Sequence, residues 1–214
     1  FSGQASHASG TFDDLTVTAP TQVDGEYVIP QEITSGDGRQ TVLALKRNHV
    51  VVADGELSLT LPDSSVQSAR PGVERVMLGR GTRYTNFALG ATVDVNPAAP
   101  GPAGCGLVFR LASDTDYTLA YIDQDGDYGV SKRTGDNFSA DLYGQNAAVG
   151  RGTHLLLVIA DDNTIYYYVD RKLVGTLDNT PQDGEVGIAV VNFEPNSTTC
   201  QYTNFWLWEW EQVP

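Results

Sequence analysis

Short stretches in which apolar and polar residues alternate recur along almost the whole chain, separated by turns rich in Gly, Pro, Asn and Asp. Alternation with a period of two residues places one set of side chains on each face of a β-strand. Turns spaced by about eight to twelve residues are typical of β-sandwiches. The pattern predicts strands at residues 26–33, 41–52, 56–61, 75–79, 87–95, 105–112, 117–123, 128–133, 154–160, 164–170, 172–178, 185–193 and 204–210.

Tight turn signals join several of these strands. They are DQDGD at residues 123–127, VDRKLVG at 169–175 and PQDGEVG at 181–187. Such turns connect consecutive antiparallel hairpins. Helical periodicity is almost absent, and the one stretch compatible with a helical turn is DSSVQSARPG at 63–72, which Pro71 would end. We therefore predict an all-β protein.

The tetrapeptide YTNF opens two of the predicted strands, at residues 84–87 and again at 202–205. In the first strand, alternation from Phe87 places the large apolar residues on one face and the small or polar ones on the other. In the second strand, Phe205 and Leu207 match the apolar face. The opposite face then carries Trp206, Trp208 and Trp210 in one strand and Ala88, Gly90 and Thr92 in the other. We expect neighbouring strands that enter one sheet through similar corners, with the indoles lying across the small residues.

Composition adds limits to this picture. The chain has 214 residues, of which 41% are hydrophobic and 19% charged, values that suit one globular β-domain over residues 1–214. Its formal charge of −14, with only 13 Lys and Arg, argues against nucleic acid and against anionic membrane surfaces. No apolar run is long enough for a membrane helix, so we expect no membrane insertion. The chain starts at Phe1, which we interpret as a trimmed ectodomain or mature fragment that is monomeric.

A family resemblance follows from the order of the motifs. The run GCGLVFRLASDTDYTLAYIDQDGDYGVSKR, then THLLLVIADDNTIYYYVDRKLVGTLDN, GEVGIAVVNF and YTNFWLWE, resembles the concanavalin A-like lectin/glucanase superfamily. The likeness is strongest to the laminin-G-like and keto-disaccharide-hydrolase-like jelly-roll modules of bacterial surface proteins. It implies a two-sheet antiparallel β-sandwich of the concanavalin A-like jelly-roll kind. Residues 23–48 are longer than that pattern needs and predict an extra N-terminal hairpin. Because this fold hosts enzymes, lectins and adhesive modules, the resemblance leaves the activity open.

The chain's two cysteines predict a disulfide. Cys105 precedes the GLVFR strand and Cys200 precedes the last strand, so a bridge would tie distant hairpins together. Such bridges persist in oxidising compartments, and we therefore expect an extracellular, cell-surface or periplasmic protein. Two buried free thiols are the alternative.

Catalytic and metal motifs are weak. The Glu-x-Asp-x-x-Glu strand of related glucanases is missing, and the pair Glu209 and Glu211 is interpreted as solvated carboxylates. The spacing of Asp123, Asp125 and Asp127 does not fit an EF-hand loop and indicates a hairpin tip. The three histidines, His7, His49 and His154, are too scattered for a zinc site. No cofactor is expected, although the resemblance allows a structural Ca²⁺.

Two surfaces are candidates for ligand binding. Arg110, Tyr121 and Lys132 fall in three consecutive strands and predict a polar, aromatic patch on one sheet face; the alternative is that Arg110 pairs with an acidic residue and the tyrosines complete the core rim. The stripe of Trp206, Trp208 and Trp210 would suit sugar rings if exposed. We prefer burial of this stripe beneath residues 23–48, because an open triple-Trp stripe would be a large apolar patch.

These observations favour a non-catalytic carbohydrate-binding or sensory ectodomain whose partner is a polysaccharide or glycan. Two alternatives remain. One is a glycoside-processing enzyme of the keto-disaccharide-hydrolase-like kind, and the other is a purely structural or adhesive surface module.

Overall fold

The structure is a computed structural model that describes residues 9–12, 15–18, 32–34, 40–46, 49–61, 63–79, 81–97, 101–178 and 182–210. Antiparallel strands account for most of them. One short 3-10 turn, η2 (Ala147–Val149), has Asn146 as its N-cap. The prediction of an all-β protein is confirmed, and the described residues contain no helix with the length and apolarity needed to cross a membrane.

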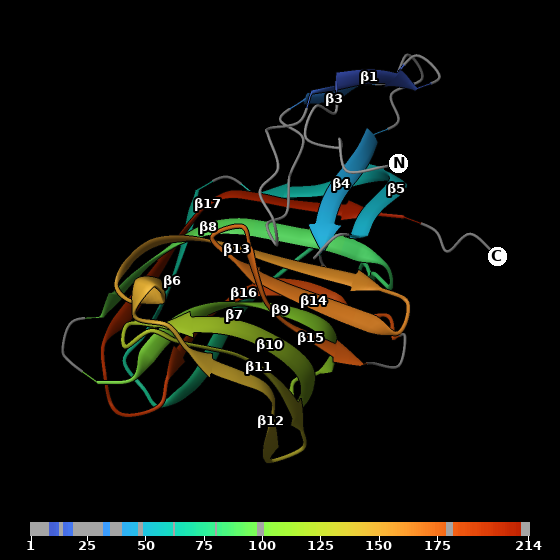
Figure 1. Ribbon diagram of the computed structural model, residues 1–214. Coiled ribbons are helices and arrows are strands. Elements are labelled where there is room, and N and C mark those ends of the chain that lie inside the picture. The colour runs from blue at the N-terminus through green and yellow to red at the C-terminus, as the bar shows by residue number, and fades with distance from the viewer. Residues whose placement is uncertain are drawn as a thin grey trace.

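Two sheets lie face to face and form a sandwich (Figure 1). The six-stranded sheet has the order β12 (Asn137–Gln145), β11 (Asp127–Thr134), β10 (Asp116–Asp123), β9 (Ala103–Ser113), β16 (Glu185–Asn192) and β7 (Gly72–Leu78). The eight-stranded sheet has the order β15 (Lys172–Asp178), β14 (Thr164–Val169), β13 (Gly152–Asp161), β8 (Phe87–Pro97), β17 (Thr198–Glu209), β5 (His49–Leu61) and β4 (Gln40–Lys46), with β6 (Ser64–Ser68) also paired to β17. The chain crosses repeatedly between the sheets, which gives the predicted two-sheet antiparallel jelly roll.

The N-terminal strands add to this sandwich. β1 (Ser9–Phe12), β2 (Leu15–Thr18) and β3 (Glu32–Thr34) form a three-stranded sheet of their own. β4 and β5 form a hairpin at one end of the eight-stranded sheet. Within the range 23–48, where an extra hairpin is predicted, the structure describes β3, which pairs with β2, and β4, which pairs with β5. Residues 23–31, 35–39 and 47–48 lie outside the described residues.

The core lies between the two sheets and contains the apolar face predicted for β8. Phe87, Leu89, Ala91, Val93 and Val95 are all buried there. Phe87 meets Phe109 of the opposite sheet, with ring centroids 6.1 Å apart in an edge-to-face arrangement. An edge-to-face pair between the sheets adds to the burial energy of both rings.

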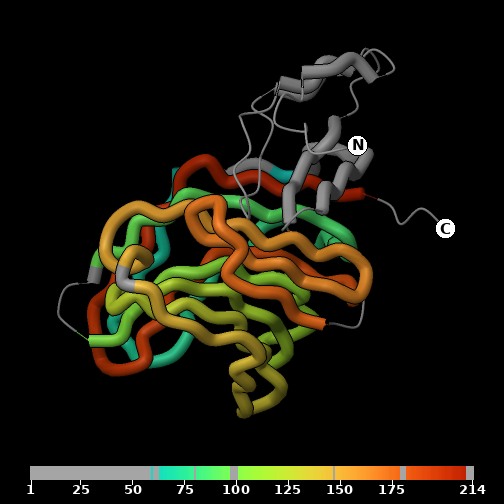
Figure 2. The backbone as a smooth tube through the Cα atoms, viewed as in Figure 1, coloured from blue at the N-terminus to red at the C-terminus, as the bar shows by residue number. Residues whose placement is uncertain are grey.

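β8 and β17 are neighbours, as the repeated YTNF suggested, and Figure 2 shows the red backbone of β17 beside the green backbone of β8. Trp206 lies opposite Gly90 and Trp208 opposite Ala88, so the predicted pairing of large with small residues is present. The expectation of similar corners is wrong, because the first tetrapeptide leads into the start of β8, opposite Glu209, whereas the second lies in the middle of the antiparallel strand β17. Tyr84 bridges to Gly184, whereas Tyr202 lies within β17 opposite Val93.

The stretch predicted as a helical turn is a strand. Residues 64–68 form β6, which pairs with Thr198–Tyr202 of β17. The physical reason is burial: Val66 points into the core, while its neighbours alternate toward solvent. A backbone ladder with β17 then satisfies the amides that a helical turn would have satisfied locally.

Candidate functional site

The outer face of the six-stranded sheet, the side turned away from the eight-stranded sheet, carries an apolar cluster. β10 alternates, with Ala120 and Ile122 in the core between the sheets and Tyr117, Leu119 and Tyr121 on the outer face. The remaining members of the outer cluster are Val108, Leu111, Ala189 and Val191, with Val73 and Met77 packed against them. The six-stranded sheet is therefore apolar on both sides.

Exposed aromatic rings collect on this outer face. Among the described residues, the exposed large hydrophobic side chains are Val76, Phe138, Tyr143 and Phe193. Tyr143 is 62% exposed, Phe138 51% and Phe193 49%. Phe138 contacts Tyr117 and Phe193 contacts Tyr121, both of which are outer-face residues. Three of the four exposed apolar side chains thus surround one cluster.

A bulge in β12 brings Phe138 and Tyr143 to the same face. Their numbers differ by five, so regular alternation would place them on opposite faces. The register with β11 shifts between Val130 and Ser131, which pair with Leu142 and Ala140 and leave Asp141 as the extra residue. Phe138 then pairs with Arg133 and Tyr143 with Gly129. The sequence analysis missed this strand because its residues are mostly polar and the bulge interrupts their alternation.

The Tyr121 cluster consists of Tyr121, Phe193, Tyr143 and Asp127. The rings of Tyr121 and Phe193 have centroids 5.6 Å apart, and Tyr121 covers Gly129, where an added Cβ would lie 3.0 Å from the Tyr121 hydroxyl oxygen. Burial, aided by Asp123, Tyr143 and Asp127, raises the pKa of Tyr121 to about 12. A hydrogen bond to the Asp127 carboxylate raises the pKa of Tyr143. Both phenols therefore keep their protons at neutral pH and act as hydrogen-bond donors.

The Tyr117 cluster consists of Tyr117, Phe138, Arg75, Arg133 and Asp114. The Arg75 guanidinium carbon lies 4.6 Å from the centre of the Tyr117 ring, and that of Arg133 lies 5.8 Å from it. Arg133 also stacks on Phe138 at 5.5 Å. Arg75 Nη2 donates to Asp114 Oδ1 at 2.8 Å. Cations held over aromatic faces are attracted by the ring quadrupole, so this arrangement positions the two guanidinium groups.

The patch predicted from Arg110, Tyr121 and Lys132 does not form. Tyr121 pairs with Gly129 and Thr118 pairs with Lys132, so Tyr121 and Lys132 point to opposite faces of the sheet. Arg110 is buried, with a positive φ of 54° in a stretch of β9 where the register of both neighbouring strands shifts. Burial lowers the pKa of Arg110 to about 10. Only Tyr121 of the three belongs to the outer face.

The tryptophan stripe lies on the outer side of the eight-stranded sheet. Trp208 is buried, at 8% exposure, against a cluster that contains Ala88, Leu157, Ile159 and Tyr168. Trp206 and Trp210 are partly buried and pack on the same cluster. The predicted cover, residues 23–48, lies largely outside the described residues. The three indoles thus support the sheet more than they present an open platform.

Asp123 organises the hairpin at 123–127. Its Oδ1 accepts hydrogen bonds from the backbone N–H groups of Asp125 and Asp127, each at 2.9 Å. Burial raises the pKa of Asp123 despite these two donors. The geometry is that of the predicted hairpin tip, and the residues that the structure describes contain no group of three His, Cys, Asp or Glu able to hold a metal.

Among the other titratable candidates, the structure gives a clear role to His154 alone in the described part of the chain. Both ring nitrogens of His154 are engaged, Nδ1 with Asp170 at 2.7 Å and Nε2 with the Gly150 carbonyl at 2.9 Å. His154 therefore ties the start of β13 to the turn after β14. Glu209 ends β17, while Glu211 and His7 lie outside the described residues; His49 starts β5.

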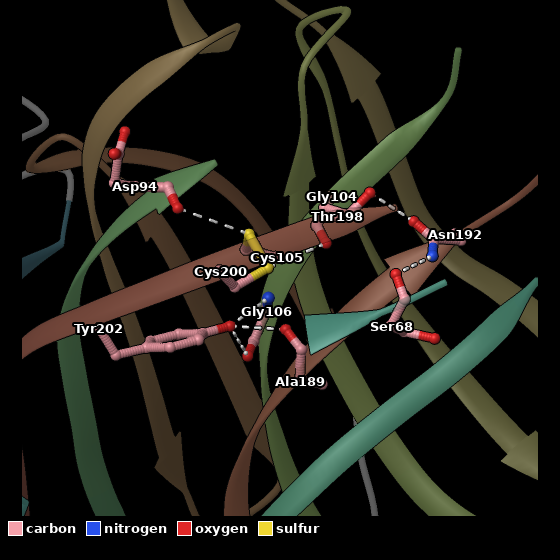
Figure 3. The surroundings of a disulfide bond; sticks show 10 residues. All are labelled: Ser68, Asp94, Gly104, Cys105, Gly106, Ala189, Asn192, Thr198, Cys200 and Tyr202. Carbon is pink, nitrogen blue, oxygen red and sulfur yellow. Dashed lines mark hydrogen bonds between the residues drawn. A yellow bond between two sulfur atoms is a disulfide. The ribbon is translucent and has the colours of Figure 1, made fainter. Parts of the chain in front are cut away.

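A disulfide joins Cys105 of β9 to Cys200 of β17, as expected from their positions (Figure 3). It links the six-stranded sheet to the eight-stranded sheet across 95 positions of sequence. Beside it, the Tyr202 hydroxyl lies against Gly106 and Ala189 (Figure 3). The strands below the outer face are thereby fixed to the opposite sheet.

Comparison with solved structures supports the fold. The carbohydrate-binding module CBM66 from Bacillus subtilis superimposes with a TM-score of 0.57 and 17% identity, over 66% of this chain and 84% of that module. The chain has a concanavalin A-like jelly-roll fold. A β-glucanase from Bacillus licheniformis superimposes with a TM-score of 0.47 and 10% identity, over 97% of this chain and 97% of the glucanase. Sheep galectin-11 superimposes with a TM-score of 0.45 and 12% identity, over 65% of this chain and 99% of the galectin. No protein-family model and no curated protein sequence matches this jelly roll.

Proposed function

We propose that the protein is a non-catalytic carbohydrate-binding domain that binds a glycan on the outer face of the six-stranded sheet. The observation that carries this proposal is the gathering of Phe138, Tyr143 and Phe193 on one face, each about half exposed or more. The apolar face of a sugar ring stacks on such side chains, while neighbouring polar groups fix its orientation. Tyr143, Asp127, Arg75 and Arg133 supply those polar groups.

The framework under this face suits binding, since fixed side chains lose little entropy when a ligand arrives. Tyr117 and Tyr121 are buried, and Arg75 and Arg133 are held by stacking. The jelly roll of CBM66 serves as a carbohydrate-binding module, which makes the same use reasonable here, although a fold does not by itself imply a function. The disulfide supports a location outside the cytoplasm, at the cell surface, in the periplasm or in the medium.

Glycoside hydrolysis is the second candidate function, favoured by the raised pKa of Asp123 near the exposed rings. A retaining or inverting mechanism needs two carboxyl groups that flank the scissile bond. Asp123 is buried and its Oδ1 already accepts two backbone hydrogen bonds, so it acts as the acceptor of a turn. Release of reducing ends from a bound polysaccharide, lost in Asp123→Asn or Asp127→Asn, would favour the enzyme.

A glycan array tests the binding proposal. We expect the wild type to bind a defined group of glycans, and Tyr143→Ala and Phe138→Ala to lose that binding with an unchanged melting temperature. Val76→Ala is the matched control, since Val76 is exposed on edge strand β7 and faces away from Arg75 and Met77. Trp210→Ala removes an indole from the outer side of the eight-stranded sheet and tests whether the glycan binds there.

The outcomes separate the alternatives. Binding lost in Trp210→Ala but kept in Tyr143→Ala would move the site to the eight-stranded sheet. Binding to no glycan would contradict the proposal and favour a structural or adhesive module.

A further inference from the structure

The cationic groups of the outer face stand out in an acidic chain. The protein has 27 Asp and Glu against 13 Lys and Arg. Two of those few cations, Arg75 on β7 and Arg133 on β11, approach the ring of one tyrosine from strands that are not neighbours in the sheet. Their convergence on Tyr117 is therefore a local positive feature within an overall negative surface.

Stacking fixes the guanidinium groups but does not use their hydrogen-bond donors. Arg133 Nε donates to the Gly135 carbonyl at 3.0 Å, and within the described part of the chain Arg133 forms no ion pair. A guanidinium group has five N–H donors in a planar fork that matches carboxylate and sulfate oxygens. Arg133 therefore keeps terminal donors for an acceptor from outside.

Arg75 holds a carboxylate that a ligand can replace. Its Nη2 donates to Asp114 Oδ1 at 2.8 Å and to the Asp114 carbonyl at 3.2 Å. The Asp114 side chain is 98% exposed, whereas the Arg75 side chain, packed on Tyr117, is only 14% exposed, so water reaches this ion pair from the carboxylate side. The Asp114 carboxylate can therefore move away into solvent, while the guanidinium group stays in place. The Asp114 carboxylate thus marks the position at which Arg75 can bind the anionic group of a ligand.

We propose that the glycan bound at the outer face is anionic, an inference that rests on the proposed function. Its carboxylate or sulfate group is held by Arg75 and Arg133 above Tyr117, and the adjoining sugar ring stacks on Phe138. In the free protein the Asp114 carboxylate pairs with Arg75, and the anionic group of the ligand replaces that carboxylate.

The overall charge opposes this binding at long range, but salt weakens that repulsion. At physiological ionic strength charges more than about 8 Å apart are largely screened, whereas a direct guanidinium contact is screened much less. The net charge of −14 therefore selects against polyanions that make no such contact. An acidic glycan would bind through these two arginines and would not bind to the surface in general.

Paired probes on one backbone test the proposal. Oligogalacturonates are compared with their methyl esters, which removes carboxylates, and chondroitin sulfate oligosaccharides are compared with their desulfated forms, which removes sulfates. Affinity is measured by calorimetry at 0.15 M salt for the wild type, Arg133→Gln, Arg133→Lys and Asp114→Asn. Lys172→Gln, which removes an exposed positive charge on β15 of the other sheet, is the control for net charge.

We expect the acidic member of one pair to bind about tenfold or more tightly than its neutral form. Arg133→Gln should lose this preference and Arg133→Lys should keep part of it, because an ammonium group retains the charge without the fork. Asp114→Asn should bind the acidic probe several-fold more tightly, since the competing carboxylate is gone. Lys172→Gln should match the wild type.

Equal binding of acidic and neutral probes would overturn the anionic specificity and leave the glycan-binding proposal intact. Weaker binding of the acidic probe to Asp114→Asn than to the wild type would also overturn the anionic specificity and leave the glycan-binding proposal intact. Failure of every acidic and neutral glycan to bind would overturn both proposals.

Discussion

The Tyr202 hydroxyl and the backbone of Gly106, 96 positions apart in the sequence, are joined inside the sandwich. The hydroxyl oxygen accepts from the Gly106 N–H at 2.9 Å and lies 2.6 Å from the Ala189 carbonyl, to which it can donate. Tyr202 belongs to the eight-stranded sheet, and its partners belong to β9 and β16 of the other sheet. Burial raises the pKa of this phenol, so it stays protonated.

Removing that hydroxyl should destabilise the sandwich. Tyr202→Phe leaves the buried Gly106 N–H without its partner, which costs about 1–3 kcal/mol in the free energy of unfolding. Urea denaturation followed by tryptophan fluorescence measures the change. Tyr143→Phe, at an exposed ring, is the control, and a Tyr202→Phe protein as stable as that control would contradict the role assigned to the hydroxyl.

Loss of the disulfide should lower stability further. A bridge that spans 95 positions stabilises by roughly 4–5 kcal/mol in the chain-entropy model, so Cys105→Ala with Cys200→Ala should unfold at much lower urea. Adding a reductant that opens the bridge should shift the wild-type midpoint the same way and leave the double variant unchanged. If both thiols of natively purified protein react with an alkylating reagent, the bridge is absent.

Trp206 and Gly90 fit together so closely that the glycine should be irreplaceable. A Cβ at Gly90 would lie 2.4 Å from Trp206 Cζ2. We expect Gly90→Ala to lower the free energy of unfolding by about 1–3 kcal/mol, because the added carbon must displace the indole. Trp206→Leu makes room, and in the double variant the added cost of Gly90→Ala should nearly vanish. A double-mutant cycle measures this coupling, and additive losses would rule out the contact as the cause.

The pH dependence of stability should contain a contribution from Asp123. Its pKa in the folded protein is raised above the ordinary carboxyl value, so the folded state binds more protons than the unfolded state in the range above about pH 4. Stability from this group is present at low pH and lost as pH rises through the raised value.

Asp123→Asn keeps an oxygen for the two turn amides and removes the titration. Relative to the wild type, its stability should therefore rise as the pH increases from about 4 through the raised pKa of Asp123. Melting temperatures across this range, with Asp125→Asn in the same turn as the control, give the comparison. Parallel pH profiles for wild type and Asp123→Asn would show that the buried carboxyl is not linked to folding.

The sequence by itself determined the faces of the regular strands. Alternation from Phe87 assigned the buried side of β8 correctly, and the match with Phe205 and Leu207 placed the indoles opposite Ala88 and Gly90. This succeeded because one side of each strand is packed in the core, so a slip of one residue would expose the whole apolar set. The positions of Cys105 and Cys200, each close to the beginning of a predicted strand, were likewise sufficient to suggest their bridge.

The tertiary structure decided the candidate site. Phe138 and Tyr143 reach one face only because Asp141 is an extra residue against β11, and that register depends on the partner strand. In the same way, the left-handed backbone of Arg110 lies where both neighbours of β9 shift register, which buries a side chain expected on the surface. A bulge is set by pairing between strands and leaves no periodic signal in its own residues, so alternation along the chain cannot locate it.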